Sequence, residues 1–361
     1  MLEYRTGCSF EKINMGFSQL NSDACIYIRI TEEDRSIIAI YVDDIIIACS
    51  IDDTMVDLKR KIAEKFDVED MGELHYFLGV KIEQNNDNGT IWIGQPTYVK
   101  DVLNKFNMKD CNPISTPVDV NSKLVKSNLD EKQCDKEMYQ SAVGSLLYIS
   151  TRTRPDIAFA VGNLAKYCSQ PSLSHWTGVK RVLRYLKGTV NLGLSYHSSE
   201  TLSLTGYSDA DWAGELDSRK STSGYVFMIN NVPVSWRSKL QSCVALSTAE
   251  AEYMSLASAA QEAVWIQRLL LEICQQKDGV VPTIIYEDNQ SAISMSKNPQ
   301  FHGRTKHIDI KHHFIREKVV ENTIKLEYCK SEEMAADILT KALNAPQFTK
   351  LRNRLGLVEN S

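Results

Sequence analysis

The sequence predicts an α/β protein, in which an α+β first half is followed by a mixed sheet with helices packed on it. Three observations predict this fold class. Two runs of branched apolar residues flank a polar segment within residues 25–48, as in a strand hairpin. Helical patterns dominate residues 139–188. From residue 200 onward, strand-like runs alternate with helix-like segments.

The first half has short strand-like and helix-like segments. Residues 25–48 predict strand–turn–strand, because "TEEDRS" separates "CIYIRI" from "IIAIYVDDIIIA". A hairpin is expected over residues 76–95, where "NNDNG" supplies the turn residues. Helices are expected over residues 53–66 and 95–108, and the polar stretch 109–123 is the best linker candidate.

The helical middle of the chain is broken at Pro155, and its last helix, residues 175–188, stops at Gly188. Three cations lie on one face of that helix at helical spacing: Lys180, Arg184 and Lys187. Such a row is typical of a solvated surface or of a phosphate-contacting stripe, and both interpretations stay open.

The region after residue 200 predicts a mixed sheet. Its first three strands are expected in "LSLTGYSDADWAG", "GYVFMIN" and "VPVSWRS". The remaining predicted elements are a helix over 247–274, a strand over 282–288, helices over 289–297 and 309–322, a strand over 323–329 and a closing helix over 332–343.

The composition is that of a soluble globular protein, with 43% hydrophobic and 24% charged residues. A formal net charge of −5 means that any nucleic-acid binding must rest on local basic patches. Nine scattered cysteines without a CxxC pair argue against a zinc module and a disulfide scaffold. The start lacks the apolar core of a signal peptide, and Asp43 and Asp44 interrupt the longest apolar run. We therefore expect a soluble intracellular protein.

Several acids of the second half stand where strands end or where burial is expected. Phosphodiester hydrolysis by two metal ions needs carboxylates that converge on ions roughly 4 Å apart. Mg²⁺ prefers such oxygen ligands. The candidate acids are Asp209, Asp211, Glu250, Glu252, Asp288 and Asp337.

The candidates can be sorted by position. Ser247 and Glu250 fit a capping box, so Glu252, two residues deeper in the helix, is favoured as the functional acid. Asp209 and Asp211 share strand parity, and Asp209 is nearer the body of the strand.

Each of the remaining acids has an ordinary structural alternative. Asp288 could be a plain helix N-cap, and Glu287 should point to the opposite face of the strand. Asp337 could form an i, i+4 ion pair with Lys341. Taken together, and in this order of elements, the acids favour a metal site.

Residues 296–318 form the most basic stretch, with six Lys or Arg against Asp309 and Glu317. This local excess is a candidate phosphate-contacting patch. Its four histidines are an alternative metal site, which is disfavoured because no Cys or carboxylate cluster lies at ligand spacing. The residues expected to contact nucleic acid here are Arg304, Lys306, Lys311 and Arg316.

Ten ordered motifs resemble the carboxyl-terminal region of a copia-type LTR retrotransposon Pol polyprotein. They are "AIYVDDIIIA", "GELHYFLGVKI", "TRPDIAFAVG", "VKRVLRYLKGT", "YSDADWAG", "RKSTSGYVF", "VALSTAEAEY", "EDNQSAI", "RTKHIDIKHHFIRE" and "ADILTKAL". The resemblance implies a reverse transcriptase palm and thumb remnant over residues 1–112 and a mostly helical connecting segment over 113–200. A ribonuclease H-like domain over 201–345 and a tail over 346–361 would follow.

The resemblance also implies an activity and its residues. Asp209, Glu252, Asp288 and Asp337 match the acids with which this family, using Mg²⁺ or Mn²⁺, cuts the RNA strand of an RNA–DNA hybrid. The loop before the last acid, "YCKSEEMAAD", lacks the histidine of many ribonucleases H. The resemblance therefore does not extend to a proton shuttle or a product-release helper at that place.

The "YVDD" motif resembles the metal turn of the polymerase, with Asp43 and Asp44 as metal ligands. The family also needs a third aspartate from an earlier palm strand, and no earlier acid here has a matching context. We therefore expect a truncated polymerase portion without activity in this chain alone.

Two other hypotheses remain open. One is a catalytically silent, nucleic-acid-binding remnant of a transposable element. The other is a different two-metal nuclease, such as an integrase-like enzyme. The expected partners are an RNA–DNA hybrid and other Pol or capsid segments of the element, with no membrane. The expected location is the cytoplasm, in a virus-like particle, or the nucleus.

Overall fold

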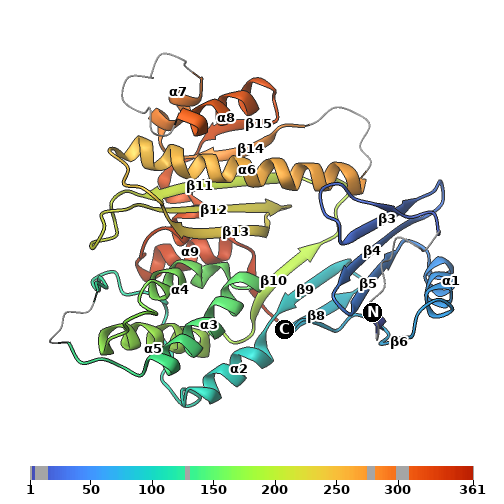
Figure 1. Cartoon of the computed structure of the whole chain (residues 1–361), viewed down its shortest axis with the longest axis horizontal. Coiled ribbons are helices and arrows are strands. Elements are labelled where there is room, and N and C mark those ends of the chain that lie inside the picture. Colours follow the sequence, from blue (N-terminus) through green and yellow to red (C-terminus); the bar gives the residue numbers. More distant parts are fainter. Residues whose placement is uncertain (1, 5–14, 127–130, 275–280, 298–308, 361) are drawn as a thin grey trace. The chain divides into compact units, whose positions relative to one another are not determined.

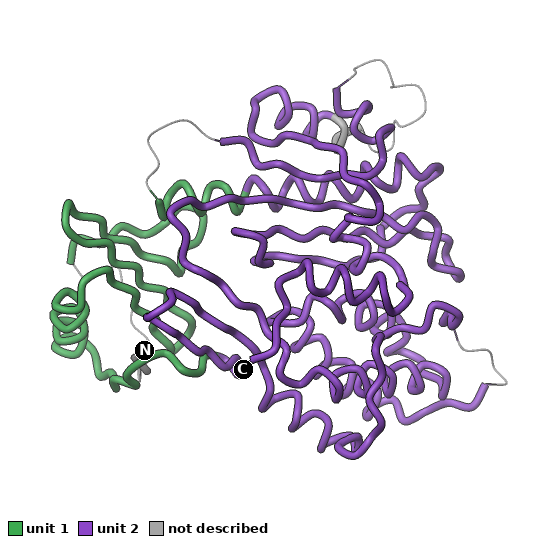
Figure 2. The backbone as a smooth tube through the Cα atoms, turned by 180° about the vertical axis from the view of Figure 1, so that it is seen from behind, with its two compact units in different colours: residues 1–77, 265–279 green, residues 78–264, 280–361 purple. Residues whose placement is uncertain are grey.

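The computed structural model describes residues 2–4, 15–126, 131–274, 281–297 and 309–360. The chain forms two compact units, coloured separately in Figure 2. Unit 1 comprises residues 1–77 and 265–279, and unit 2 comprises residues 78–264 and 280–361. The domain boundaries at residues 112, 200 and 345, which the motif resemblance implies, remain predictions.

Unit 1 contains a sheet of strand order β2-β3-β4-β5-β1-β6, and helix α1 packs on it (Figure 1). The core between them holds Ile38 and Ile45 of the sheet and Leu58 and Ile62 of the helix. The elements are β1 (Leu2–Tyr4), β2 (Ser18–Gln19), β3 (Ile26–Ile30), β4 (Arg35–Tyr41), β5 (Asp44–Cys49), α1 (Asp52–Ala63), β6 (Val68–Asp70) and β7 (Tyr76–Phe77).

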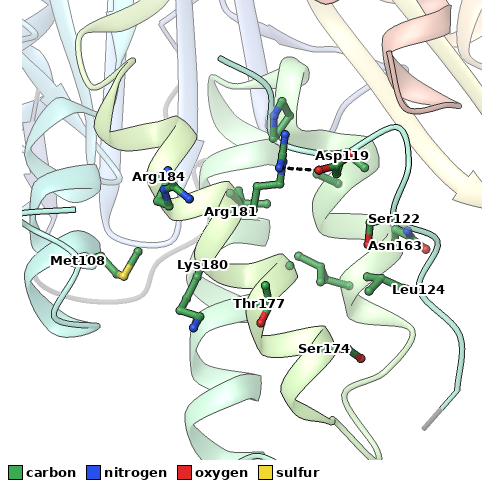
Figure 3. A pocket seen from close by; sticks show the side chains of 16 residues that line it. Met108, Asp119, Ser122, Leu124, Asn163, Ser174, Thr177, Lys180, Arg181 and Arg184 are labelled. Atoms are coloured by element: carbon green, nitrogen blue, oxygen red, sulfur yellow. Dashed lines mark hydrogen bonds and ion pairs between the residues drawn. The ribbon is translucent and has the colours of Figure 1, made fainter. Parts of the chain in front are cut away.

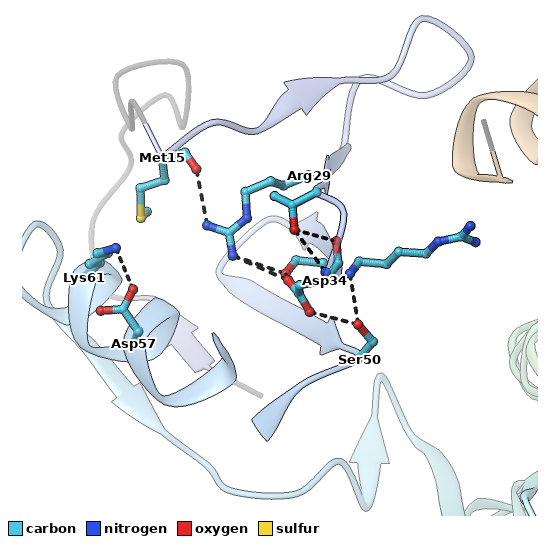
Figure 4. A network of polar contacts seen from close by, with 9 residues as sticks. Met15, Arg29, Asp34, Ser50, Asp57 and Lys61 are labelled. Carbon is cyan, nitrogen blue, oxygen red and sulfur yellow. Dashed lines mark hydrogen bonds and ion pairs between the residues drawn. The ribbon is translucent and has the colours of Figure 1, made fainter. Parts of the chain in front are cut away.

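A buried polar network fixes the base of the β4–β5 hairpin, as Figure 4 shows. Asp34, 6% exposed, accepts hydrogen bonds from Ser36 Oγ at 2.5 Å and Ser50 Oγ at 2.9 Å. Arg29 lies 3.6 Å from the same carboxylate and also donates to the carbonyl oxygen of Met15. The hydroxyl groups lower the pKa of Asp34, so its buried charge is well compensated.

Unit 2 contains the mixed sheet predicted for the second half, of strand order β13-β12-β11-β14-β15. The first three strands are antiparallel, and β14 and β15 run parallel to β11. The elements of this part are β11 (Leu204–Asp211), β12 (Thr222–Ile229), β13 (Val232–Leu240), α6 (Thr248–Cys274), β14 (Thr283–Glu287), α7 (Gln290–Lys297), α8 (Asp309–Val320), β15 (Ile324–Tyr328), η4 (Ser331–Glu333) and η5 (Ala335–Leu339). The last part of α6, from residue 265 on, is counted with unit 1.

Different elements pack on the two faces of this sheet. Ala210 packs with Ala251 and Met254 of α6, so one face of β11 lies against that helix (Figure 1). Tyr207, on the opposite face of β11, belongs to the core that contains the η5 residues. Tyr286 of β14 pairs with Tyr207 in register and stacks on it, at 5.0 Å between ring centroids.

Helices and a second sheet form the rest of unit 2. Strands β8, β9, β10 and β16 are antiparallel neighbours in the order β16-β10-β9-β8. The elements are β8 (Val80–Asn85), β9 (Thr90–Gly94), α2 (Pro96–Lys105), α3 (Lys136–Arg152), η2 (Pro155–Ile157), α4 (Ala158–Ala165), α5 (Leu173–Lys187), β10 (Leu192–His197), α9 (Ala345–Arg354) and β16 (Leu357–Glu359).

Most predicted elements are confirmed, the short strands β1, β2 and β6 are additional to them, and three further features differ. The closing helix predicted over residues 332–343 is wrong in type: the segment forms the two 3₁₀ turns η4 and η5. All of residues 334–340 are buried, so packing on both sides overrides the helix propensity of this segment. Residues 346–361, predicted as a tail, contribute to α9 and β16, and strand β10 was not foreseen.

Candidate metal centre

The four acids that the sequence favoured lie together at one end of the mixed sheet. Asp209 is on β11, Glu252 is on α6, Asp288 directly follows β14, and Asp337 is in η5. Asp209 is 1% exposed, Asp337 is 5% exposed and Glu252 is 6% exposed. The structure therefore brings together side chains from four separate elements.

The acids form two groups that share Asp288. In the first group, carboxylate oxygens of Asp209, Asp288 and Asp337 lie within 4.8 Å of one another. In the second group, the same limit holds for Glu252, Glu287 and Asp288. Asp288 is thus the common member, at the point where β14 ends.

Asp209 is held by its surroundings on both sides. Ser255 Oγ of α6 donates to its carbonyl oxygen at 2.8 Å, and the Thr340 hydroxyl donates to its carboxylate. Gly224 lies opposite Asp209 on β12, and a Cβ at that position would lie 2.8 Å from Leu339 Cβ. The absence of a side chain at Gly224 therefore allows η5 to approach the acid this closely.

The beginning of α6 separates a structural glutamate from a site glutamate. The Glu250 amide donates to Ser247 Oγ at 3.2 Å, and the Glu250 carboxylate accepts from the amide of Leu246 at 2.8 Å. Glu250 therefore closes the helix start, as the capping motif predicts. Glu252 lies further in, and its Oε2 has no hydrogen-bond partner among the described residues.

The interpretation of Asp288 as a helix N-cap is wrong. Asn289 caps α7, because its Oδ1 accepts from the amide of Ala292 at 3.0 Å. Asp288 instead accepts a hydrogen bond from Ser331 Oγ of η4 at 2.6 Å. The cap is supplied by the neighbouring asparagine, so the Asp288 carboxylate is available at the end of the strand.

Glu287 is the site residue that the sequence did not identify. It lies on the face of β14 opposite Tyr286, as strand alternation predicts. That face is the one covered by α6, and α6 carries Glu252. The alternation was visible in the sequence, but the face on which the helix packs was not.

Lys341 supplies the positive charge of the centre. Its Nζ lies 2.9 Å from Asp337 Oδ1 and 3.7 Å from Asp209 Oδ2. The predicted i, i+4 ion pair with Asp337 is therefore confirmed, and it occurs inside the acid cluster. The neighbouring carboxylates raise the pKa of Lys341, which keeps it charged.

Burial and mutual repulsion raise the pKa values of the clustered acids. For Asp209, Glu252 and Glu287, loss of hydration is the largest cause, and neighbouring carboxylates raise the pKa further. The same two causes raise the pKa of Asp337 to about 7. Among the described residues, one lysine faces five carboxyl groups, so positive charge is scarce in this region.

The donor set fits a divalent metal ion. All the candidate ligands are carboxylates, which are the oxygen donors that Mg²⁺ and Mn²⁺ prefer. Buried carboxylate oxygens without a partner, such as Glu252 Oε2 and Glu287 Oε2, can stay ionised only beside a compensating positive charge. Asp211 is half-buried on β11 and lies outside both groups.

The polymerase-like turn has a different environment. Asp43 is exposed in the two-residue turn between β4 and β5, and Asp44 is the half-buried first residue of β5. Neither belongs to a cluster of three metal-ligating side chains in the part of the chain that the structure describes. Asp23, an earlier acid, accepts from the amide of Cys25 at 2.8 Å and closes a local turn.

Two of the predicted basic contacts line a cavity of about 320 Å³ in unit 2, shown in Figure 3. Lys180 and Arg184 of α5 reach it, and Arg184 Nε also donates to the carbonyl oxygen of Asn112 at 2.7 Å. Between them, Arg181 forms an ion pair with Asp119 at 3.0 Å (Figure 3). Lys187 is exposed on the last turn of α5.

The second basic stretch is only partly described. Arg304 and Lys306 lie outside the described residues, and Lys311 lies on α8, where its side chain is not described. Arg316 Nε donates to the carbonyl oxygen of Met295 at 3.2 Å. The role of all seven predicted basic residues in nucleic-acid binding remains a prediction. No helix among the described residues is long and apolar enough to cross a membrane.

Comparisons with known proteins identify the family. The model of the family "Reverse transcriptase (RNA-dependent DNA polymerase)" matches residues 5–120. The retrovirus-related Pol polyprotein from transposon TNT 1-94 of Nicotiana tabacum is 41% identical over 346 residues, which cover 94% of this chain and 26% of that polyprotein. A putative transposon Ty5-1 protein of Saccharomyces cerevisiae is 31% identical over 249 residues, which cover 69% of this chain and 80% of that protein.

Solved structures with a related arrangement include LC11-RNase H1, isolated from compost, at 16% identity and a TM-score of 0.29. That match covers 38% of this chain and 92% of the other. The foamy viral protease-reverse transcriptase matches at 14% identity and a TM-score of 0.43, over 81% of this chain and 55% of the other. The chain spans about a quarter of the length of the first curated relatives. The ordered motifs and the sequence identities show that the chain belongs to the copia-type, retrovirus-related Pol family.

Proposed function

We propose that this chain hydrolyses the RNA strand of RNA–DNA hybrids, with a divalent metal ion, Mg²⁺ or Mn²⁺, as cofactor. One observation carries the proposal: buried carboxylates from four elements form two groups that share Asp288. The family supports the choice of substrate, because its model describes an RNA-dependent DNA polymerase, and DNA synthesis on an RNA template produces an RNA–DNA hybrid. No polar donor of the described chain compensates Glu252 Oε2 or Glu287 Oε2.

Within this proposal, Asp209, Glu252, Asp288 and Asp337 would hold the metal ions. Bound metal would supply an activated water molecule and would stabilise the leaving 3′ oxygen. Thr340 and Ser331 orient two of these carboxylates through hydrogen bonds. Burial of the cluster keeps bulk water from screening its charges, which strengthens each electrostatic contact with a phosphate or a cation.

In this proposal Lys341 compensates charge in the metal-free chain and contacts the substrate after a metal ion has bound. In the metal-free chain its ammonium group lies between Asp209 and Asp337 and offsets part of their repulsion. A cation that enters the first group would compete with Lys341 for the same oxygens. The released ammonium group, on a partly exposed side chain, could then pair with a phosphate of the substrate.

We also propose the partners and the limits of this activity. The basic residues Lys180, Arg184, Lys187, Arg304, Lys306, Lys311 and Arg316 would contact the hybrid backbone. Other Pol or capsid segments of the element would be protein partners, in a cytoplasmic virus-like particle or in the nucleus. The Asp43–Asp44 turn would not support primer extension by this chain, because no third acid joins it in the described part.

The test is cleavage of an end-labelled RNA–DNA hybrid by the purified full chain. We expect cleavage of the RNA strand in the presence of Mg²⁺ or Mn²⁺, and none in the presence of EDTA. A DNA duplex of the same sequence serves as the substrate control. Cleavage that persists in Asp209→Asn, or that does not require a divalent cation, would refute the assignment. A silent remnant would bind the hybrid without cutting it.

A further inference from the structure

Glu287 is a buried acid at the end of β14 whose charge is only partly compensated. Its side chain is 0% exposed. Its Oε1 accepts a hydrogen bond from the amide of Asn289 at 3.2 Å. Its Oε2 has no hydrogen-bond partner within the described part of the chain. Burial of an acceptor without a partner is costly, and for an ionised carboxylate the cost is larger.

The described residues around Glu287 supply acids and no cation. An oxygen of Glu287 lies within 4.8 Å of oxygens of Glu252 and Asp288. Glu252 Oε2 is itself buried and without a partner. Lys341, the lysine of the cluster, forms its ion pairs with Asp209 and Asp337 of the other group. The group that contains Glu287 therefore has no comparable counterion among the described side chains.

Two other acids of unit 2, the buried Glu215 and the half-buried Glu262, show how a structural carboxylate is satisfied. Glu215 accepts from the amide and the hydroxyl of Ser218, and Lys166 lies 3.8 Å from it. Glu262 accepts from Tyr225 and Ser235 hydroxyls, at 3.2 and 2.7 Å. Glu287 has no such set of donors, although it is more deeply buried than Glu215.

We propose that Glu287 is a metal-binding residue, which holds a divalent cation together with Glu252 and Asp288. This inference rests on the proposed function and adds a fifth carboxylate to the four acids assigned from the motifs. The acids then divide by face. Asp209 and Asp337 approach from the η5 side, Glu252 and Glu287 approach from the α6 side, and Asp288 takes part in both groups.

The test compares Mn²⁺ binding by the full wild-type chain and by Glu287→Gln, measured by isothermal titration calorimetry. Glutamine keeps the size of the side chain and removes its charge. We expect Glu287→Gln to bind Mn²⁺ about 10- to 100-fold more weakly. Glu215→Gln is the matched control, because it neutralises a buried glutamate of the same unit outside the cluster; its Mn²⁺ affinity should equal that of the wild type.

Thermal unfolding gives a second readout that does not depend on activity. Without metal, Glu287→Gln should melt at a higher temperature than the wild type, because one of several repelling buried acids is neutral. With saturating Mn²⁺ this difference in melting temperature should become smaller or change sign, because the variant binds the stabilising cation less well. A metal-free variant that melts lower than the wild type would assign Glu287 a purely structural role and would overturn the inference.

Parallel hybrid-cleavage assays separate the inference from the proposed function. If the wild type cleaves and Glu287→Gln binds Mn²⁺ as tightly as the wild type, the inference about Glu287 is overturned and the proposed function stands. If the wild type neither binds Mn²⁺ nor cleaves, both fail. Glu287→Asp, which keeps the charge on a shorter side chain, should bind Mn²⁺ with an affinity between those of the wild type and Glu287→Gln. Equal affinities of all three proteins would also overturn the inference.

Discussion

Two acidic motifs of this chain look alike in sequence and differ in structure. Asp43 and Asp44 lie at the tip of a hairpin, exposed or half-buried, and they join no third metal-ligating side chain among the described residues. Asp209 and its partners are buried at the end of a sheet, within 4.8 Å of other carboxylates. Proximity of acids along the sequence is therefore a weaker sign of a metal site than convergence of acids from separate elements.

Asp34 of unit 1 shows that burial alone is not the decisive property. It is as buried as Glu252, but two hydroxyl groups and Arg29 compensate its charge (Figure 4). Its pKa is lowered, whereas the pKa of Glu252 is raised. Buried acids with donors keep their charge and stabilise a fold, whereas buried acids that face one another must either hold protons or bind a cation.

The largest expected effect is on hybrid cleavage by Asp209→Asn. Asp209 is a metal ligand in the proposed function, so its loss should remove several kcal/mol of transition-state stabilisation, which corresponds to at least about a hundredfold in rate. Asp211→Asn is the matched control, because it makes the same change two residues along β11 and outside both groups. Equal losses in the two variants would remove the distinction between these aspartates.

Asp34→Ala should destabilise unit 1 without affecting cleavage. The substitution leaves Arg29 and two hydroxyl groups without their shared acceptor, which should cost about 1–3 kcal/mol. Hydrogen exchange of the β4 and β5 amides measures this effect locally. Asp57→Ala, which removes an exposed ion pair with Lys61 (Figure 4), should change the exchange less. A larger effect at Asp57 would contradict the structural role of Asp34.

The stability of the metal-free chain should depend on pH through Asp337. Its pKa is raised to about 7 in the folded chain, from an ordinary value of 3.8. Between about pH 4 and pH 7 the folded chain therefore binds more protons at this residue than the unfolded chain does. The contribution of Asp337 to the free energy of unfolding is full below about pH 4 and is lost as the pH rises through 7.

Urea denaturation between pH 5 and pH 8 in the presence of EDTA measures this dependence. In Asp337→Asn the free energy of unfolding should depend less on pH, since the variant has no proton to lose at this position. Saturating Mg²⁺ should also reduce the decrease in the free energy of unfolding with rising pH, because the cation stabilises the ionised acids. A wild-type slope that Asp337→Asn leaves unchanged would show that other groups control the pH dependence.

The smallest effect on hybrid cleavage is expected for substitutions in the turn between β4 and β5. The double variant Asp43→Asn and Asp44→Asn should cleave the hybrid at the wild-type rate, because both side chains lie outside the two acid groups. Neither the wild type nor the variant should extend a primer on an RNA template. Primer extension by the wild type that the double variant loses would show that the turn is a working polymerase centre.

Much of the candidate site could be predicted from the sequence. Asp209, Glu252, Asp288 and Asp337 each stand in a recognisable local context: a strand, the second turn of a capped helix, the end of a strand and a buried alanine-rich segment. Local rules also separated Glu250 from Glu252, because a capping box has a fixed spacing. These features depend on neighbours in sequence. The strands, the strand end and the helix cap were predicted correctly, whereas the helix predicted around Asp337 is a 3₁₀ turn.

The features that depend on distant packing could not be predicted. Glu287 faces Glu252 because α6 covers that face of the sheet, which no local pattern encodes. Strand β10 is defined by pairing with β9 and β16, at distant positions in the sequence. The 3₁₀ conformation of η5 results from burial of the whole segment against β11 and β12.

The central claim is that the converging buried acids, and not the acids of the turn, form the metal centre. Electron paramagnetic resonance of free Mn²⁺, titrated with the full chain, tests it most directly. The account predicts that Asp288→Asn, which affects the acid common to both groups, greatly weakens Mn²⁺ binding. The Asp43→Asn and Asp44→Asn double variant should bind like the wild type. Loss of binding in the double variant, with normal binding in Asp288→Asn, would contradict the account.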